Sequence, residues 1–220
     1  MAHAEPGPTT WTVIVPVKEL ATAKSRLAPH VGGLRRGLAL AMAVDTVTAI
    51  AACEGVDVLV VTDDQDAAAA MAGIARVVPD LPGAGINAAL QHGAAAVGPS
   101  LGRHLAAVQA DLPSLRPAEL AAALRVAVRT DQAFVADEAG TGTTLYAASW
   151  SHFAPHFGRG SAAAHRQVAD ELTLDVPTLR RDVDTIEDLW AAVRLGVGPC
   201  TAALLPSLAA TPTKSVKSAC

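Results

Sequence analysis

Mostly apolar runs of strand length alternate along the chain with longer segments rich in alanine and leucine. The strand-like runs cover residues 11–17, 56–62, 103–110 and 132–137. The helix-length segments cover residues 33–52, 65–73, 86–97 and 117–129. Pro117 fits the first turn of the last of these segments, where a missing backbone N–H costs nothing. Continuous apolar strands that alternate with helices predict a mostly parallel sheet covered by helices on both faces.

The regular alternation changes near residue 138. The segment EAGTGTTLYAAS, residues 138–149, predicts a turn followed by a short strand. The segment FGRGSAAAHRQVADEL, residues 157–172, predicts a glycine-rich loop that leads into a helix. The segment RRDVDTIEDLWAAVRLG, residues 180–196, predicts a short strand that enters a final helix.

These boundaries predict one α/β domain over residues 11–198. The start, MAHAEPGPTT, carries no such pattern, and we expect residues 1–10 to be disordered. Residues 199–220 combine Pro, Thr and Ser with little periodicity, which predicts a flexible C-terminal tail. A length of 220 residues suits a single domain of this kind.

The composition is that of a soluble globular protein, with 51% hydrophobic and 17% charged residues. Aromatic residues make up only 3%, so alanine, valine and leucine must build the core. The net charge is −4 and no lysine- or arginine-rich block occurs, which excludes a protein that coats nucleic acid. The start resembles no secretory signal, no apolar run is long enough to span a bilayer, and the three cysteines are scattered. We therefore expect a cytoplasmic protein without a membrane partner.

A basic loop follows the first predicted strand. It contains Lys18, Lys24 and Arg26, although the whole chain has only four lysines against thirteen arginines. Flexible lysine and forked arginine donors suit the clustered negative charges of a triphosphate. The loop lacks the G-x-x-x-x-G-K-[ST] pattern of a P-loop. A solvated surface loop is the alternative interpretation of the same residues.

Two acidic segments are candidates for a metal site. Asp111 ends an apolar run, and Asp182 and Asp184 stand two apart in RDVDT, so they would share one face of an extended piece. Carboxylates from separate loops that leave positions for water and phosphate oxygens are typical of Mg²⁺ sites. Alternatively Asp184 or Thr185 caps the last helix, with Asp188 completing a capping box, and the two roles can coexist.

Two glycine-rich segments could approach an anion. GTGTT, residues 140–144, opens a strand and lacks the third glycine of a dinucleotide fingerprint. It predicts a tight turn, or a close backbone approach to an anionic substrate that the Thr143 hydroxyl assists. Gly158, Gly160 and Ser161 precede a helix whose amides could accept a carboxylate or phosphate, and Ser161 is equally a plain N-cap candidate.

The segment DLPGAGINAAL, residues 80–90, places Asn87 near the start of a helix, where it could cap the helix or read a nucleobase edge. The seven histidines show no zinc-binding spacing, and we expect His165 on the surface of a helix. No G-x-S-x-G elbow occurs and Cys53 ends an apolar helix-like run, so covalent catalysis has no good candidate.

Six segments occur in one order from residue 15 to residue 189: VPVKELATAKSRLAP, GINAAL, ADLPSL, GTGTT, FGRGSAAAH and DVDTIEDL. Together they closely resemble the CofC guanylyltransferases, which make the activated phospho-acid used to build the deazaflavin coenzyme F-420. The first and last segments are specific, whereas ADLPSL and GINAAL are shared with other nucleotidyltransferases of this fold. The resemblance implies a single-domain nucleotidyltransferase, GT-A-like and Rossmann-like, with a mostly parallel central sheet flanked by helices. It also implies that GTP reacts with phosphoenolpyruvate or 2-phospholactate and that pyrophosphate leaves.

Carried over position by position, the resemblance implies four sets of site residues. The metal site, which would hold Mg²⁺, matches Asp111, Asp182 and Asp184. The catalytic triphosphate loop, which acts with Asp111, matches Lys18, Lys24 and Arg26. The GTP pocket includes Gly83, Gly85 and Asn87. The positions that hold the phospho-acid are Thr143, Gly158 and Ser161. Ala110 stands where relatives usually have glycine, a small change that should not disturb its neighbour.

The implied chemistry needs no nucleophilic side chain. A phosphate oxygen of the phospho-acid is already ionised at neutral pH, so positioning and charge neutralisation suffice. In this hypothesis the two lysines of the opening loop hold the departing pyrophosphate. By analogy with high-GC bacteria, the arginine- and alanine-rich composition favours phosphoenolpyruvate over 2-phospholactate. The product would pass to the next enzyme of the coenzyme pathway, and a homodimer is compatible with the sequence.

Three other functions are alternatives. A molybdopterin guanylyl- or cytidylyltransferase would share the fold and metal site, but its first loop is glycine-rich, whereas here the first glycine after the strand is Gly32. A metal-dependent glycosyltransferase would use a D-x-D motif, which Asp182 and Asp184 form at the wrong end of the chain. A nucleotide-binding module without catalysis would typically have lost one of the two acidic segments.

Overall fold

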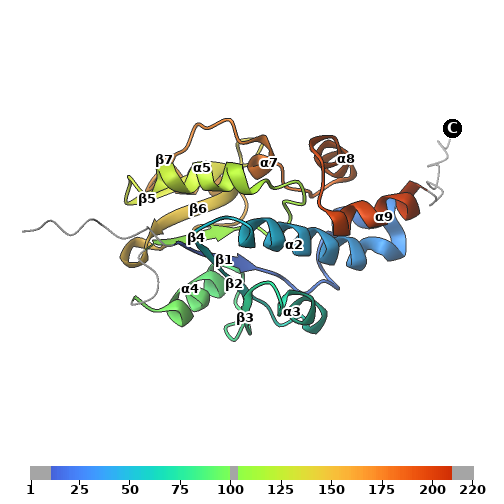
Figure 1. The fold of residues 1–220 in the computed structure, drawn as a ribbon, viewed down its shortest axis with the longest axis horizontal. Helices are drawn as coiled ribbons and strands as arrows, with labels where there is room; N and C mark the ends of the chain where they lie inside the picture. Colours follow the sequence, from blue (N-terminus) through green and yellow to red (C-terminus); the bar gives the residue numbers. More distant parts are fainter. Residues whose placement is uncertain (1–10, 100–103, 210–220) are drawn as a thin grey trace, which may run out of the picture.

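The computed structural model describes residues 11–99 and 104–209 of the chain. They form a seven-stranded sheet in the order β3-β2-β1-β4-β6-β5-β7, with helices on both faces (Figure 1). The pairs β3–β2, β2–β1, β1–β4 and β5–β7 are parallel. Strand β6 pairs antiparallel with both β4 and β5. The prediction of an α/β domain with a mostly parallel central sheet is confirmed.

The predicted apolar runs form strands with nearly the expected bounds. The strands are β1 (Trp11–Pro16), β2 (Val56–Val61), β3 (Arg76–Val78), β4 (His104–Val108), β5 (Gln132–Ala136), β6 (Thr143–Ser149) and β7 (Asp170–Glu171). The sequence did not reveal β3 and β7, because two or three residues are too few to show a periodicity. These two strands lie on the edges of the sheet.

The predicted helical segments also form helices. The helices are α1 (Ala28–Val31), α2 (Arg35–Ala51), α3 (Gln65–Met71), α4 (Ile86–Val97), α5 (Pro117–Ala127), α6 (Ser161–His165), α7 (Pro177–Arg180), α8 (Ile186–Leu195) and α9 (Pro199–Ala209). Single 3-10 turns are η1 (Ser25–Leu27), η2 (Gly32–Leu34) and η3 (Trp150–His152). Pro117 is the first residue of α5, as predicted. No described helix is long and apolar enough to cross a bilayer.

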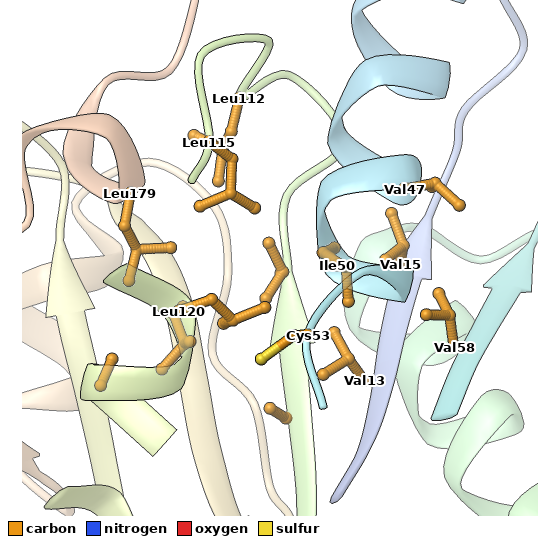
Figure 2. Packing of buried hydrophobic residues seen from close by; sticks show 14 of the residues in the cluster. Val13, Val15, Val47, Ile50, Cys53, Val58, Leu112, Leu115, Leu120 and Leu179 are labelled. Atoms are coloured by element: carbon orange, nitrogen blue, oxygen red, sulfur yellow. The ribbon is translucent and has the colours of Figure 1, made fainter. Parts of the chain in front are cut away.

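Successive side chains of the central strands point to opposite faces of the sheet and contribute to two separate cores. On one face, Val13 and Val15 of β1 belong to a cluster that also contains side chains of α2, α5 and α7 (Figure 2). On the other face, Ile14 belongs to a second cluster, which also contains side chains of α4 and α6 and the aromatic residues Phe134 and Tyr146. Because strand side chains alternate in direction, one apolar run can serve both layers. The sheet is therefore buried on both faces, and the loops at its ends are left for function.

The predicted short strand at the start of residues 180–196 is wrong. Pro177 begins the short helix α7, and the following residues run to α8 without pairing in the sheet. Val183 is instead tied to the end of β4, because its N–H donates to Asp111 O at 3.1 Å. This contact brings the two predicted acidic segments together.

The predicted flexible tail is also wrong over its first part, where α9 packs on α2. Asp45 of α2, which is 5% exposed, accepts from the N–H groups of Cys200 at 3.0 Å and Thr201 at 2.7 Å. A carboxylate from a distant segment thus caps the start of α9. The predictions for residues 1–10 and for the end of the tail lie outside the described residues.

Candidate active site

Two adjoining cavities open at the carboxyl ends of the central strands, where sheets of this kind bind ligands. One, of about 460 Å³, is lined by the loop after β1 and the segment after β4, including Lys18, Lys24, Gln109, Asp111 and Asp184. The other, of about 700 Å³, extends toward β2 and β3 and is lined by residues that include Asp64, Asp80, Gly83 and Gly85. Lys18, Thr22 and Ile86 line both cavities, so the two form one continuous region.

Lys24 lies at the centre of the charged end of this region. Its Nζ donates to Asp111 Oδ2 and, at 2.7 Å, to Asp184 Oδ1. Burial lowers the pKa of Lys24, but attraction to the two carboxylates outweighs burial, and the net change is a raised pKa. Lys24 is therefore a fixed positive charge between the end of β4 and the segment before α8.

The backbone of Lys24 is unusual as well. Among the described residues it is the only non-glycine residue with a positive φ, 55°. A side chain in the left-handed region costs about 1 kcal/mol or more, and such strain concentrates at functional sites. Lys24 therefore combines a strained backbone with a side chain that bonds two carboxylates.

The other two basic residues of the loop lie farther from the carboxylates. Arg26 Nη1 is 3.8 Å from Asp184 Oδ2, and its side chain is 74% exposed. Lys18 is exposed and lines both cavities. The structure thus brings Lys18 and Lys24 to one cavity, and the contact with Asp184 places the exposed Arg26 beside it.

The three predicted metal carboxylates share one electrostatic field. Burial, followed by repulsion from Asp111, Asp137 and Asp184, raises the pKa of Asp182 to about 7. Burial also raises the pKa of Asp184, but the charge and hydrogen bond of Lys24 outweigh it, and the net change is a lowered pKa. Asp111 Oδ1 is buried and has no hydrogen-bond partner in the described part of the chain. The site thus favours the charged form of Asp184 and disfavours that of Asp182.

Within residues 11–99 and 104–209, no group of three or more His, Cys, Asp and Glu side chains is arranged to hold a metal ion. The Lys24 ammonium lies between Asp111 and Asp184 and bonds both of them. The donor set nevertheless fits a hard divalent cation by its chemistry, because it consists of carboxylate oxygens and includes the unpartnered Asp111 Oδ1.

Two residues that the sequence did not single out hold the basic loop in place. Asp64 Oδ2 accepts from the N–H of Leu20 at 3.0 Å, while its Oδ1 caps α3. Arg35, at the start of α2, donates to the backbone carbonyls of Ala21 and Ala23. Burial raises the pKa of Asp64, but backbone hydrogen bonds and Arg36 outweigh it and lower the net pKa. Both contacts span distant segments, so no local pattern reveals them.

The predicted cap of the last helix is present. Thr185 is the N-cap of α8 and forms a reciprocal capping box with Asp188. Asp184, one residue earlier, keeps its carboxylate for Lys24. Capping and the acidic cluster therefore coexist, as the sequence allowed.

The predicted nucleotide residues lie on the larger cavity, except for the side chain of Asn87. Gly83 and Gly85 line that cavity with φ values of 53° and 96°, which favour glycine. Asn87 Nδ2 donates to Phe157 O at 2.9 Å, and its Oδ1 accepts from Phe157 N at 2.8 Å. Because both ends of this amide are engaged, Asn87 ties α4 to the loop before α6 and does not present its amide to a nucleobase.

The GTGTT segment forms the predicted tight turn, which Asp137 organises. Its two carboxylate oxygens accept from the N–H groups of Thr141 at 2.9 Å and Gly142 at 2.7 Å. Gln109 Nε2 donates to Thr143 O at 2.7 Å and fastens the turn to the end of β4. Thr143 itself is fully buried and its hydroxyl bonds His165 Nδ1 at 2.8 Å. The prediction that this hydroxyl contacts the substrate is thereby corrected, since it faces the core.

The predicted loop and helix at residues 157–165 are present, with two corrections. Gly160, with φ of 71°, is the N-cap of α6, so Ser161 is the first helical residue and not the cap. His165 is not on the surface but 0% exposed, between β5, β6 and the loop before α6. Gly158 is exposed, with a φ of 139° that favours glycine.

Comparisons with known proteins show the family to which the chain belongs. The family model described as "Guanylyl transferase CofC like" matches residues 11–218. The phosphoenolpyruvate guanylyltransferase of Thermomonospora curvata is 53% identical over 203 residues, which cover 89% of this chain and 88% of the relative. The enzyme of the same name from Streptomyces coelicolor is 54% identical over 205 residues, covering 90% of this chain and 97% of the relative.

Solved structures support the same fold at much lower identity. A nucleotidyl transferase from Methanothermobacter superposes with a TM-score of 0.60 at 19% identity, covering 84% of this chain and 97% of that protein. The structural likeness establishes the fold, and the family relationship rests on the sequence matches. A match over nearly the whole described chain, with relatives more than half identical, shows that the chain belongs to the CofC-like guanylyltransferase family.

Proposed function

We propose that this protein transfers GMP from GTP to phosphoenolpyruvate and releases pyrophosphate, as a step in building coenzyme F-420. The observation that carries the reaction class is the meeting of a basic loop and an acidic cluster at Lys24, on the edge of a large cavity. The choice of phosphoenolpyruvate is supported by the names of relatives that are more than half identical. GTP would place its base toward Gly83 and Gly85 and its triphosphate toward Lys18, Lys24 and Arg26.

Two parts of the site would then serve the two substrates. We call residues 17–26 and 80–87 the nucleotide half, because residues from both segments line the two cavities. We call the turn 137–143 and the loop 153–161 the acceptor half. The acidic cluster lies between them, because Lys24 of the nucleotide half bonds Asp111 and Asp184, and the charge of Asp137 in the acceptor half raises the pKa of Asp182. An acceptor that reaches the α-phosphorus from the side opposite the nucleotide cavities would approach over the acceptor half.

The reaction needs one new bond and one broken bond. A phosphate oxygen of phosphoenolpyruvate attacks the α-phosphorus of GTP, and the bond from that phosphorus to the bridging oxygen of pyrophosphate breaks. The attacking oxygen is ionised at neutral pH, so no side chain has to remove a proton. The chain contributes alignment and positive charge, which is the main source of catalysis in phosphoryl and nucleotidyl transfer.

Lys24 has a direct part in this scheme. Its Nζ already bonds two carboxylates that would face the metal-bound triphosphate. Lys18 and Arg26, on the open side, would bind the β- and γ-phosphates and stabilise the charge of the leaving pyrophosphate. Asp64 and Arg35 fix the loop backbone, so the three cations are presented from a defined position.

Mg²⁺ would be held by Asp111, Asp182 and Asp184. Bound there, it would neutralise charge on the phosphates and withdraw electron density from the α-phosphorus. Asp111 Oδ1 is the atom best placed to accept such an ion, since it is buried without a hydrogen-bond partner among the described residues. A cytoplasmic location and a homodimer complete the proposal, on the basis of composition and analogy.

The test is release of pyrophosphate from GTP and Mg²⁺ by the purified protein, with phosphoenolpyruvate and 2-phospholactate in separate reactions. We expect release with phosphoenolpyruvate that depends on Mg²⁺ and is lost in Asp111→Asn. Release with 2-phospholactate alone would keep the reaction class and change the acceptor. Absence of release with either acid would overturn the proposed function and leave the fold.

A further inference from the structure

His165 lies between the two segments of the acceptor half and bonds both of them, although it lines neither cavity. It is fully buried and stacks on Tyr146, with ring centroids 4.8 Å apart. Phe157 meets the imidazole edge-on at 5.4 Å, and Phe134 lies at 5.6 Å. Such an apolar surrounding disfavours the charged form, and burial lowers the pKa of His165 to about 4. His165 is therefore a neutral imidazole at physiological pH.

The two ring nitrogens of His165 bond different segments. Nε2 accepts from the backbone N–H of His156 at 2.9 Å, so it carries no proton. In a neutral imidazole the proton is then on Nδ1, which donates to Thr143 Oγ1 at 2.8 Å. One bond holds the first residue of β6 after the tight turn, and the other holds the loop before α6.

The remaining ties of these segments lead back to the reacting centre. The turn is fastened to the end of β4 by Gln109, two residues before Asp111. The charge of Asp137, in the same turn, contributes to the raised pKa of Asp182. The loop is fastened to α4, which begins at the nucleotide cavity, through Asn87 and Phe157. Any shift of the loop against the turn would thus alter the surface that an acceptor meets beside the acidic cluster.

We propose that His165 is a positioning residue that sets the acceptor half, by locking the turn 137–143 to the loop 153–161 through one defined tautomer. This inference rests on the proposed function for the identity of the acceptor. It assigns no contact between His165 and substrate. A small error in acceptor alignment costs about tenfold to hundredfold in rate, so a buried lock of this kind has a measurable catalytic effect.

Three substitutions separate the two bonds. His165→Asn places an amide near Nδ1 and can keep the bond to Thr143, but it does not reach His156 N. His165→Gln reaches toward Nε2 and can keep the bond to His156 N. His165→Ala removes both. Asp45→Asn is the control for a general loss of stability. It weakens the contact between α2 and α9 and leaves the contacts of the acceptor half unchanged.

Steady-state kinetics with each substrate varied in turn provide the first measurement. We expect His165→Ala to raise KM for phosphoenolpyruvate about tenfold or more and to change KM for GTP by less than about twofold. His165→Asn and His165→Gln should each restore part of the loss. Equal changes in both KM values, or the same profile in the Asp45→Asn control, would overturn the proposal.

Amide hydrogen exchange provides the second measurement and does not depend on turnover. We expect His165→Ala to lose protection at residues 141–143 and 156–157, with GTP binding retained. His165→Asn should keep protection at the turn, and His165→Gln should keep it at the loop. Unchanged exchange in all three variants would overturn the lock. If the wild-type protein released no pyrophosphate, the proposed function and the identity of the acceptor would both be wrong. The exchange measurement would still show whether His165 holds the turn to the loop.

Discussion

The nucleotide half and the acceptor half of the site are stabilised by different forces. In the nucleotide half, Lys24 joins two carboxylates, and Arg26 and Lys18 stand exposed beside it. In the acceptor half, the neutral His165 is surrounded by aromatic rings and bonded at both nitrogens. The site residues of one half are mainly charged, with Lys24 buried and the other two cations exposed, whereas the other half is ordered by neutral hydrogen bonds and aromatic packing.

This difference suits the two substrates that we propose. A triphosphate brings several charges and a metal ion, so its binding region must be able to exchange partners when the ligand enters. Charges near the surface are screened by salt and can be reorganised at small cost. A small acceptor brings few contacts, so its position must already be defined before it binds, which a buried lock provides. Substitutions that remove a charge should therefore affect mainly the nucleotide half. Substitutions that change buried packing, and protonation of the buried histidine, should affect mainly the acceptor half.

The largest effect is expected at the boundary between the two halves. Asp111→Asn keeps the shape of the side chain but removes the charge that Lys24 and a metal ion would share. We expect turnover with GTP and phosphoenolpyruvate to fall about 10³-fold, in the range found when one preorganised charge is removed from an active site. Pyrophosphate release measures the loss, and circular dichroism checks the fold. A loss below tenfold would remove Asp111 from the catalytic set.

Within the nucleotide half, Lys24 should matter far more than Arg26. Lys24→Met keeps the length of the side chain and removes the ammonium that bonds Asp111 and Asp184. We expect about a 10²-fold fall in kcat/KM for GTP with little change in KM for phosphoenolpyruvate.

The matched control is Arg26→Gln, because Arg26 is 74% exposed and only 3.8 Å from one of the same carboxylates. Screened by solvent, it should contribute less than about tenfold. Equal losses in the two variants would show that net charge of the loop, and not the buried position of Lys24, controls binding.

The acceptor half should respond to pH in its stability. His165 has an ordinary pKa of 6.5, lowered to about 4 in the folded protein. As pH falls below 6.5, the unfolded chain takes up a proton at this residue before the folded chain does, so folding loses stability between about pH 6.5 and pH 4. The full effect is at most ~3 kcal/mol, from 1.36 kcal/mol per pKa unit. Urea unfolding at several pH values measures it.

The same experiment needs His165→Gln as a reference. Asp182 acts in the opposite sense, because its folded pKa is raised to about 7 and its contribution falls as pH rises above 3.8. The variant keeps Asp182 and lacks the histidine, so the difference between the two proteins isolates His165. A difference that does not change between pH 7 and pH 5 would contradict a buried neutral imidazole.

Local sequence patterns were sufficient where one element determines the outcome. The apolar runs predicted β1, β2, β4 and β5, and Thr185 with Asp188 predicted the capping box. The meeting of Lys24 with Asp111 agrees with the rule that loops after parallel strands gather at one edge of the sheet, because these residues follow β1 and β4. Such features depend on periodicity, on capping chemistry or on a general property of the sheet.

Features that depend on a distant partner could not be predicted in this way. His165 ends the run Ser-Ala-Ala-Ala-His, which reads as a helix surface until Thr143 and His156 supply its two bonds. Asp64 and Arg35 hold the basic loop from other elements, and nothing near them in the sequence indicates that contact. The reversed direction of β6 is likewise a tertiary outcome, because an apolar run shows no direction.

The smallest effect on catalysis is expected at α9, outside both halves. Asp45→Ala removes the two bonds that cap this helix and should lower stability by about 1–2 kcal/mol, or Tm by about 3–6 °C. Asp45 shares α2 with Arg35, which holds the basic loop. Ten residues along a helix separate them by about 15 Å, and the rigid turns between them should keep the change local. Thermal unfolding and KM for GTP measured on the same sample test this. A raised KM for GTP would show that α2 transmits the docking of α9 to the nucleotide half, so that charge alone does not order that half.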